Sequence, residues 1–272
     1  MPSPTSISTD KLSRLIGLPK CPQLIDVRTE EDFAADPRLL PGAIRRDWQR
    51  AAEWGRSVNS DVVVYCQQGL KLSEGAAAWL RHYGGSASNL EGGFEAWVTA
   101  GQPAVPTSKM PIRDLQGRTI WVTRSRPKVD RIACPWLIRR FVDPSAVFLF
   151  VAPSEVKMVA ERFGAVPFDI EGTFWSHRGS KCTFDTMVEE FNLGTPHLSQ
   201  LAAIVRAADT ANLNDAAEAS GLLAVSLGLS RMFSNDLEQL ESGMVVYDAL
   251  YRWCRDATDE THNWPTNRAR PQ

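Results

Sequence analysis

The chain has 272 residues, of which 43% are hydrophobic and 23% charged, and its formal net charge at pH 7 is -2. This length favours two domains, each with a modest core. The near-neutral charge gives no global reason to expect nucleic-acid binding, so any basic patch must be local. Five scattered cysteines without a CxxC pair do not form a disulfide framework, which predicts reduced thiols.

No segment of the sequence predicts export or membrane insertion. The stretch MPSPTSISTDKLSRL lacks the positive region followed by an apolar one that marks a signal peptide. No window approaches 18 uninterrupted apolar residues, and the most apolar segment, 220–229, is short enough to be a core helix. We therefore expect a cytoplasmic protein with no membrane contact.

Residues 1–105 alternate short apolar runs with helical patterns. The runs QLIDVR (23–28) and DVVVYC (61–66) are typical of parallel strands that are buried on both faces. Helical spacing follows over 71–84, and the segment 86–101 predicts a short strand, a turn and another helix. This alternation predicts an α/β domain with an open parallel sheet and flanking helices.

A second domain is expected over 119–258. The segment before it, 106–118, lacks periodicity and contains prolines, so it is predicted to be a linker. Strands are expected at 119–124 and 146–151, and later residues are almost wholly helical, which predicts a mostly helical α+β domain. The expected helices are 128–142, 153–164, 183–192, 197–209, 213–228 and 235–256. The polar, proline-containing segment 259–272 is predicted to be a disordered tail.

Cys66 stands where an expected strand ends and a helix is about to begin. The loop from Cys66 to Lys71 contains Gly69, whose conformational freedom lets backbone N–H groups turn towards the sulfur. The helix N-terminus and the Lys71 ammonium add positive potential. These features favour a thiolate nucleophile. The alternative is a buried structural thiol, because cysteine is among the most buried residue types.

Motifs around this cysteine lead to a family. IDVR places Asp26 and Arg28 at the end of an earlier strand, and PGAI, CQQGLK and GGFEAW follow in order. With these motifs residues 1–105 resemble a single-domain rhodanese. The resemblance implies that Cys66 carries sulfane sulfur as a persulfide, with Lys71 as a second catalytic residue. The substrate-binding residues are then expected to be Gln67, Gln68, Gly69, Leu70 and Arg28.

The same resemblance defines the expected reaction. A small-molecule donor such as thiosulfate would give sulfur to Cys66, and a thiol or cyanide would remove it, with no cofactor required. Lys71 stands where the family commonly has arginine, and Leu40 where it has histidine, so the preferred donor is left open. The six-residue loop argues against a phosphatase, because related phosphatases use a longer loop.

The stretch TIWVTRSRPKVDRIACPWLIRRF (119–141) is rich in basic residues interleaved with apolar ones. Guanidinium groups held near a pocket can bind an oxyanion, and Arg131 and Arg139 are the expected ligands for chromate or sulfate. A solvated basic surface is the plain alternative. Nucleic acid is the weaker expectation, because no helix-turn-helix or zinc-finger spacing accompanies the charge.

The stretch FWSHRGSKCTFD supplies a histidine, a cysteine and a carboxylate within nine residues. Such a combination suits a transition metal, and a thiolate with an imidazole favours zinc or iron. The alternative is a polar helix face in water. The expected metal ligands are His177 and Cys182, completed from among Cys134, Asp185 and Asp209.

Residues 119–256 resemble the C-terminal domain of ChrB-type chromate-resistance proteins. The match runs through DRIACPWLIRRFVDP, GAVPFDIEG, HRGSKCTFD, IVRAADT and GMVVYDALYRWCR. The positions that match polar motifs are Asp130, Arg131, Cys134, Arg139, His177, Cys182 and Asp209. A rhodanese stands here where ChrB regulators carry a DNA-binding segment, so a repressor role is not carried over.

Together the two halves predict a sulfurtransferase that acts through Cys66 and is coupled to a metal- or oxyanion-binding domain linked to chromate resistance. The alternative is a chromate or oxyanion sensor whose rhodanese domain is vestigial.

Overall fold

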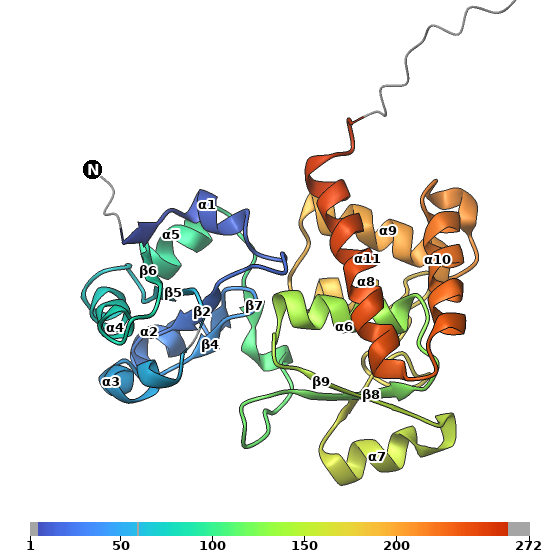
Figure 1. Ribbon diagram of the computed structural model, residues 1–272, viewed down its shortest axis with the longest axis horizontal. Coiled ribbons are helices and arrows are strands. Elements are labelled where there is room, and N and C mark those ends of the chain that lie inside the picture. The colour runs from blue at the N-terminus through green and yellow to red at the C-terminus, as the bar shows by residue number, and fades with distance from the viewer. Residues whose placement is uncertain (1–4, 59, 261–272) are drawn as a thin grey trace, which may run out of the picture.

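The computed structural model describes residues 5–58 and 60–260, which form two bodies packed side by side (Figure 1). The expected tail, 259–272, lies outside the described residues apart from its first two. None of the helices described is long and apolar enough to cross a membrane. The order of elements confirms the predicted fold class: an α/β unit with a parallel sheet precedes a unit dominated by helices.

The first body is built on a five-stranded parallel sheet. Its strand order is β1-β6-β5-β2-β4, and every pairing is parallel. The apolar runs predicted as strands form β2 and β5, and the short strand predicted within 86–101 forms β6, while the edge strands β1 and β4 were not predicted. The strands are β1 (Ser6–Ile7), β2 (Gln23–Asp26), β4 (Ile44–Arg45), β5 (Val62–Tyr65) and β6 (Ala87–Leu90).

Helices cover both faces of this sheet. Leu24, Val63 and Tyr65 face one cluster of buried side chains that includes residues of α1 and α5, whereas Ile25 and Val64 face a second cluster formed with α3 and α4. Burial on both faces explains why the strands read as unbroken apolar runs. The helices are α1 (Thr9–Ser13), α2 (Glu30–Ala35), α3 (Ala51–Trp54), α4 (Lys71–His82) and α5 (Gly93–Thr99).

The start of the expected linker is structured. β7 (Val105–Pro106) pairs in antiparallel fashion with β3 (Arg38–Leu39), and a short 3-10 turn (Thr107–Lys109) follows. The chain then reaches the second body, whose three parallel strands have the order β10-β8-β9. These strands are β8 (Ile120–Arg124), β9 (Val147–Val151) and β10 (Val166–Pro167).

Six helices complete the second body. α7 packs on one face of the small sheet, over Val122, while Trp121 and Phe148 on the other face join the main core with α6, α8, α9 and α11. The helix expected at 213–228 is divided into a 3-10 turn (Leu213–Asp215) and α10. The helices are α6 (Asp130–Phe141), α7 (Val156–Phe163), α8 (Thr183–Glu190), α9 (Pro196–Asp209), α10 (Ala219–Met232) and α11 (Asp236–Asp256).

One hydrophobic cluster runs through both bodies. It contains Leu12 and Ile16 of the first and Trp136 and Phe141 of the second. Backbone hydrogen bonds reinforce the contact, because the N–H of Gly42 donates to the carbonyl oxygen of Phe141 at 2.6 Å. The two domains therefore share a hydrophobic core.

A buried carboxylate ties the linker to the second sheet. Asp143 is 1% exposed and accepts hydrogen bonds from the Thr119 N–H at 2.6 Å and the Thr119 hydroxyl at 2.8 Å. Its other oxygen lies 3.1 Å from the Arg113 guanidinium. Asp143 thus satisfies donors at the start of β8 and neutralises a linker arginine.

We expect Asp143→Ala to destabilise the protein. Buried donors that lose their acceptor cost about 1–3 kcal/mol each, so a loss of roughly 3 kcal/mol and a Tm lower by roughly 6–12 °C are predicted. Thermal unfolding followed by circular dichroism measures this. The control is Glu53→Ala, because the Glu53–Arg50 pair is well exposed and should leave Tm nearly unchanged. Equal Tm values for the two variants would contradict the role given to Asp143.

Candidate functional sites

Cys66 lies directly after the central strand β5, as predicted. Its side chain is buried, with 5% of the residue exposed. The sulfur is 3.3 Å from the hydroxyl oxygen of Ser73, and the thiol points at the carbonyl oxygen of Leu70 at 4.0 Å. Ser73 was not predicted, although it is a fully buried hydroxyl on the first turn of α4. A buried hydroxyl beside a sulfur can donate a hydrogen bond to a thiolate.

The first two carbonyl groups of the cysteine loop are turned towards α5, and its backbone N–H groups have no partner among the described residues. The carbonyl oxygens of Cys66 and Gln67 each accept a hydrogen bond of 3.0 Å, from the N–H groups of Phe94 and Glu95 at the start of α5. Within the described residues, none of the backbone N–H groups from Gln67 to Lys71 donates a hydrogen bond to another protein group. A run of free N–H groups on a curved loop forms a site for an anion.

Two glycines hold this loop against the GGFEAW turn. Gly69 and Gly93 both have positive φ, at 69° and 59°. A Cβ on Gly69 would lie 2.2 Å from the carbonyl oxygen of Leu90, and one on Gly93 would lie 2.3 Å from both the Cys66 carbonyl oxygen and the Gly69 nitrogen. The backbones of the loop and the turn therefore touch, which explains why both motifs require glycine.

The remaining predicted residues of the loop are more open. Gln68, Leu70 and Lys71 are exposed, and Lys71 is the first residue of α4. No ion pair or hydrogen bond of the Lys71 ammonium occurs with any residue that the structure describes. Gln67 donates from its amide to Glu95 at 3.2 Å. The ammonium of Lys71 is thus free to attract an anionic substrate.

The structure contradicts the prediction that Arg28 binds substrate. Its side chain is fully buried and paired with Asp26 at 2.7 Å. The other guanidinium N–H groups donate to the carbonyl oxygens of Asp36 and Arg38, and the group lies 3.8 Å from the centre of the Phe94 ring. Every part of the guanidinium is therefore used within the protein, so Arg28 fixes the loop after β2.

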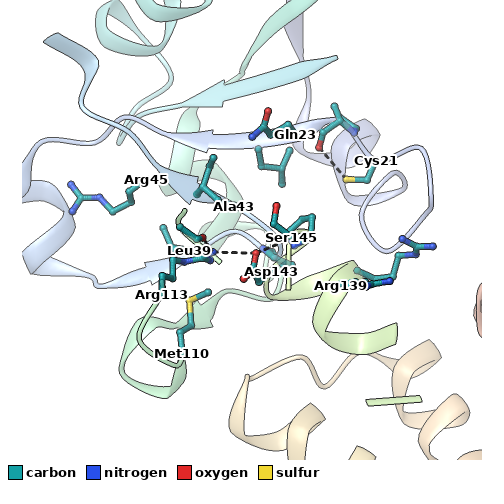
Figure 2. Close-up of a pocket in the computed structure, with 18 of the residues that line it drawn as sticks. Cys21, Gln23, Leu39, Ala43, Arg45, Met110, Arg113, Arg139, Asp143 and Ser145 are labelled. Atoms are coloured by element: carbon teal, nitrogen blue, oxygen red, sulfur yellow. Dashed lines mark hydrogen bonds and ion pairs between the residues drawn. The ribbon is translucent and has the colours of Figure 1, made fainter. Parts of the chain in front are cut away.

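The two expected oxyanion ligands lie in different places. Arg131 is directed at Asp169, at 3.3 Å, and donates to the carbonyl oxygen of Ser125 at 3.0 Å; burial lowers its pKa. Arg139 instead lines a pocket between the two domains (Figure 2), where it also pairs with Glu241. Only Arg139 is thus placed at a cavity.

This interdomain pocket has a volume of about 650 Å³ and is rich in arginine. Figure 2 shows Arg45 from the first domain, Arg113 from the linker and Arg139 from α6 around it. One terminal nitrogen of Arg113 is buried and has no hydrogen-bond partner among the described residues. Arg46, also at the wall, is exposed. Arg45, Arg113 and Arg139 are each also paired with a carboxylate, so the exposed Arg46 and the unpartnered Arg113 nitrogen are among the donors left for an anion.

A second cluster of polar side chains surrounds His177, which precedes α8. Its Nε2 lies 3.2 Å from Asp209 at the end of α9, 3.4 Å from Asp169 and 3.6 Å from Asp130 at the start of α6. Asp130 is fully buried and accepts hydrogen bonds from the Thr183 N–H at 2.6 Å. Ligand atoms of Asp130, His177 and Asp209 all lie within 4.8 Å of one another.

Protonation of this cluster follows from its crowded charges. Hydrogen bonds to Asp130 and Asp169 raise the pKa of His177 to about 10. Burial, and then repulsion from Asp130, raise the pKa of Asp209 to about 7, and burial also raises the pKa of Asp130. The cluster therefore holds a positive charge between carboxylates that would otherwise repel one another.

Three of the expected metal ligands are placed differently from the prediction. Cys134 and Cys182 are completely buried, and burial raises the pKa of both thiols. Asp185 accepts the N–H of Cys182 at 3.0 Å, which caps α8, and pairs with Arg206 at 2.5 Å. Its carboxylate is thus committed to the helix end. Of the predicted ligands, the structure brings together only His177 and Asp209.

Sequence reasoning missed Asp130 and Asp169 as members of this cluster. Asp130 begins α6, and Asp169 follows β10 by two residues. Asp169 also pairs with Arg124, at 3.1 Å. Both aspartates lie in motifs shared with ChrB-type proteins, DRIACPW and GAVPFDIEG. Their presence in these motifs was the sequence signal for them.

Comparisons with known proteins identify a domain in each body. Residues 8–100 match the model of the rhodanese-like domain, and residues 121–254 match that of the ChrB C-terminal domain. Protein ChrB of Cupriavidus metallidurans is 35% identical over 158 residues, which are 57% of this chain and 47% of that protein. The chain thus spans about half the length of this curated relative.

A sulfurtransferase of Allochromatium vinosum is 28% identical over 103 residues, which are 36% of this chain and 92% of that protein. Among solved structures, a rhodanese-related protein of Thermoplasma volcanium covers 37% of this chain and 96% of its own, with 22% identity and a TM-score of 0.33. A rhodanese-like domain protein of Staphylococcus aureus has 30% identity, coverages of 34% and 90%, and a TM-score of 0.31.

The contact between the cysteine loop and the glycine turn predicts the effect of Gly93→Ala. A methyl group there must displace backbone atoms, so the free energy of unfolding should fall by about 1–3 kcal/mol more than in Gly84→Ala. Gly84 also has positive φ, at 84°, but a Cβ on it would meet no atom within 4 Å. Urea unfolding of both variants measures the difference, and equal losses would show that the close contact is absent.

Proposed function

We propose that this chain, which carries a rhodanese-like domain followed by a ChrB C-terminal domain, transfers sulfane sulfur through a persulfide on Cys66. The observation that carries the proposal is the buried sulfur at the end of β5 together with the run of free N–H groups from Gln67 to Lys71. Those groups can bind the negative terminal sulfur of a persulfide.

The reaction has two steps. The Cys66 thiolate attacks the outer sulfur of thiosulfate, the sulfur–sulfur bond of the donor breaks, and sulfite leaves with the bonding electron pair. Cyanide or a thiolate then attacks the terminal sulfur of the persulfide, and Cys66 leaves as the thiolate. The Ser73 hydroxyl, 3.3 Å from the sulfur, can turn its proton from the Leu70 carbonyl oxygen to the Cys66 thiolate, before the donor is attacked and after the sulfur has left. Lys71 attracts the anionic donor.

Cys66→Ser should abolish thiosulfate-to-cyanide sulfur transfer, because serine cannot form a persulfide. Production of thiocyanate by the full chain measures this. Cys21→Ser is the matched control: Cys21 is also a free cysteine, but burial raises its pKa to about 12, so it is a poor nucleophile. The control should keep its full rate. Turnover by Cys66→Ser at the parental rate would overturn the proposal.

A second function, oxyanion binding, is favoured by the interdomain pocket. Arginines from both domains line it, and the buried nitrogen of Arg113 has no partner within the described chain. Chromate and sulfate are tetrahedral dianions whose oxygens accept hydrogen bonds from guanidinium groups. The ChrB C-terminal domain, which supplies Arg139 to this pocket, is what suggests chromate as the ligand, while Arg45, Arg46 and Arg113 lie outside the matched residues.

Arg46→Ala should weaken sulfate and chromate binding by roughly tenfold, as expected for one lost charge-assisted hydrogen bond. Arg46 is exposed at the pocket wall, and its side chain has no partner in the described residues, so stability should change little. Isothermal titration of the full chain measures affinity. Arg162→Ala, an exposed arginine on α7 outside the pocket, should bind normally. Equal affinity for both variants would show that Arg46 does not bind the oxyanion. If the parent protein gives no binding heat, the proposed oxyanion site is wrong.

A further inference from the structure

The cluster around His177 draws one side chain from each of four segments. Asp130 opens α6, Asp209 ends α9, Asp169 follows β10, and His177 precedes α8. These residues are far apart in sequence, yet all three carboxylates have an oxygen within 3.6 Å of the same imidazole nitrogen. The fold therefore directs nitrogen and oxygen donors towards one point.

The surrounding groups hold two of these carboxylates in place. Asp169 pairs with Arg124 at 3.1 Å and with Arg131 at 3.3 Å, and its other oxygen accepts the Thr183 hydroxyl at 3.1 Å. Asp130 accepts N–H groups at the start of α8. Such supporting hydrogen bonds are typical of side chains that orient towards a metal.

Asp209 differs from the other two carboxylates. Within the described residues Asp209 forms no ion pair with an arginine or lysine, although the charge of Arg131 acts on it from nearby. In the cluster it contacts the His177 imidazole and the Asp130 N–H. The Asp209 carboxylate is therefore the least committed of the three to other protein groups.

We propose that Asp130, His177 and Asp209 bind one divalent first-row transition ion, with Asp169 able to complete the set. Ligands about 2.0–2.2 Å from one ion lie roughly 3–4.4 Å apart, and the three donor atoms here lie within 4.8 Å of one another. His177 has 41% of its side chain exposed, so solvent reaches the site. An ion there would keep a position open for water or a small ligand.

The ligand set selects the class of metal. Carboxylates suit hard ions such as manganese, while imidazole suits iron and zinc. The buried thiols of Cys134 and Cys182 do not belong to the group of donor atoms that lie within 4.8 Å of one another, so the ligand set contains only oxygen and nitrogen. The proposal is therefore Mn²⁺, Fe²⁺ or Zn²⁺, held by oxygen and nitrogen alone, and Mn²⁺ serves as the probe.

Titration with Mn²⁺ tests the site directly. Chelator-treated full chain should bind one Mn²⁺ per chain, measured as loss of the free-ion signal in electron paramagnetic resonance. Asp209→Asn and His177→Ala should each weaken binding at least about tenfold. The matched controls are Asp215→Asn and His197→Ala, whose residues lie outside the cluster. No binding by the parent, or parental affinity in both cluster variants, would overturn the proposal.

A third pair of variants separates this site from the thiol ligands and from sulfur transfer. Cys182→Ser should keep Mn²⁺, and the cobalt-loaded parent should lack a thiolate-to-cobalt charge-transfer band. Loss of metal in Cys182→Ser together with such a band in the parent would overturn the oxygen-and-nitrogen ligand set. Cys66→Ser should also bind Mn²⁺ fully, so failure of the sulfurtransferase proposal leaves this test intact.

Discussion

The parallel arrangement of strands in the five-stranded and three-stranded sheets determines where the centres at Cys66 and His177 lie. Parallel strands bury both faces, so the carboxyl ends of the strands are where the chain can present reactive groups. Cys66 follows β5 in the first sheet, and Arg124 and Asp169 stand at the ends of β8 and β10 in the second. Both candidate centres therefore occupy the equivalent edge of their own sheet.

The centre at Cys66 stabilises negative charge and the centre at His177 stabilises positive charge, although each lies beside the N-terminus of a helix. At Cys66 the backbone supplies free N–H groups that favour negative charge. Near His177 the backbone N–H groups at the start of α8 donate to Asp130 instead. The carboxylates around the imidazole then favour a positive charge at this centre. A helix N-terminus lies beside each centre, but in one it remains open and in the other a buried side chain occupies it.

The sequence predicted strands, helices and the cysteine loop well. It predicted poorly which side chains from different segments contact one another. The apolar runs at β2 and β5 and the loop from Cys66 to Lys71 are local patterns, so they could be read directly. The commitment of Arg28 to carbonyl oxygens eight and ten residues away, and the approach of Asp130 to His177, depend on packing between segments. Cys182 shows the same limit: its spacing from His177 suited a ligand, but the fold buries its thiol.

The two domains share a core, which includes Leu12, Ile16, Trp136 and Phe141. This core limits whether one domain could be removed or exchanged without affecting the other. A domain joined only by a flexible tether can be removed or exchanged with little effect on its neighbour. Here excision of either half would expose large aromatic side chains to water and leave the Phe141 carbonyl without its donor from Gly42. Removal of either half is therefore expected to destabilise the other, and a substitution at the contact between them changes the packing on both sides.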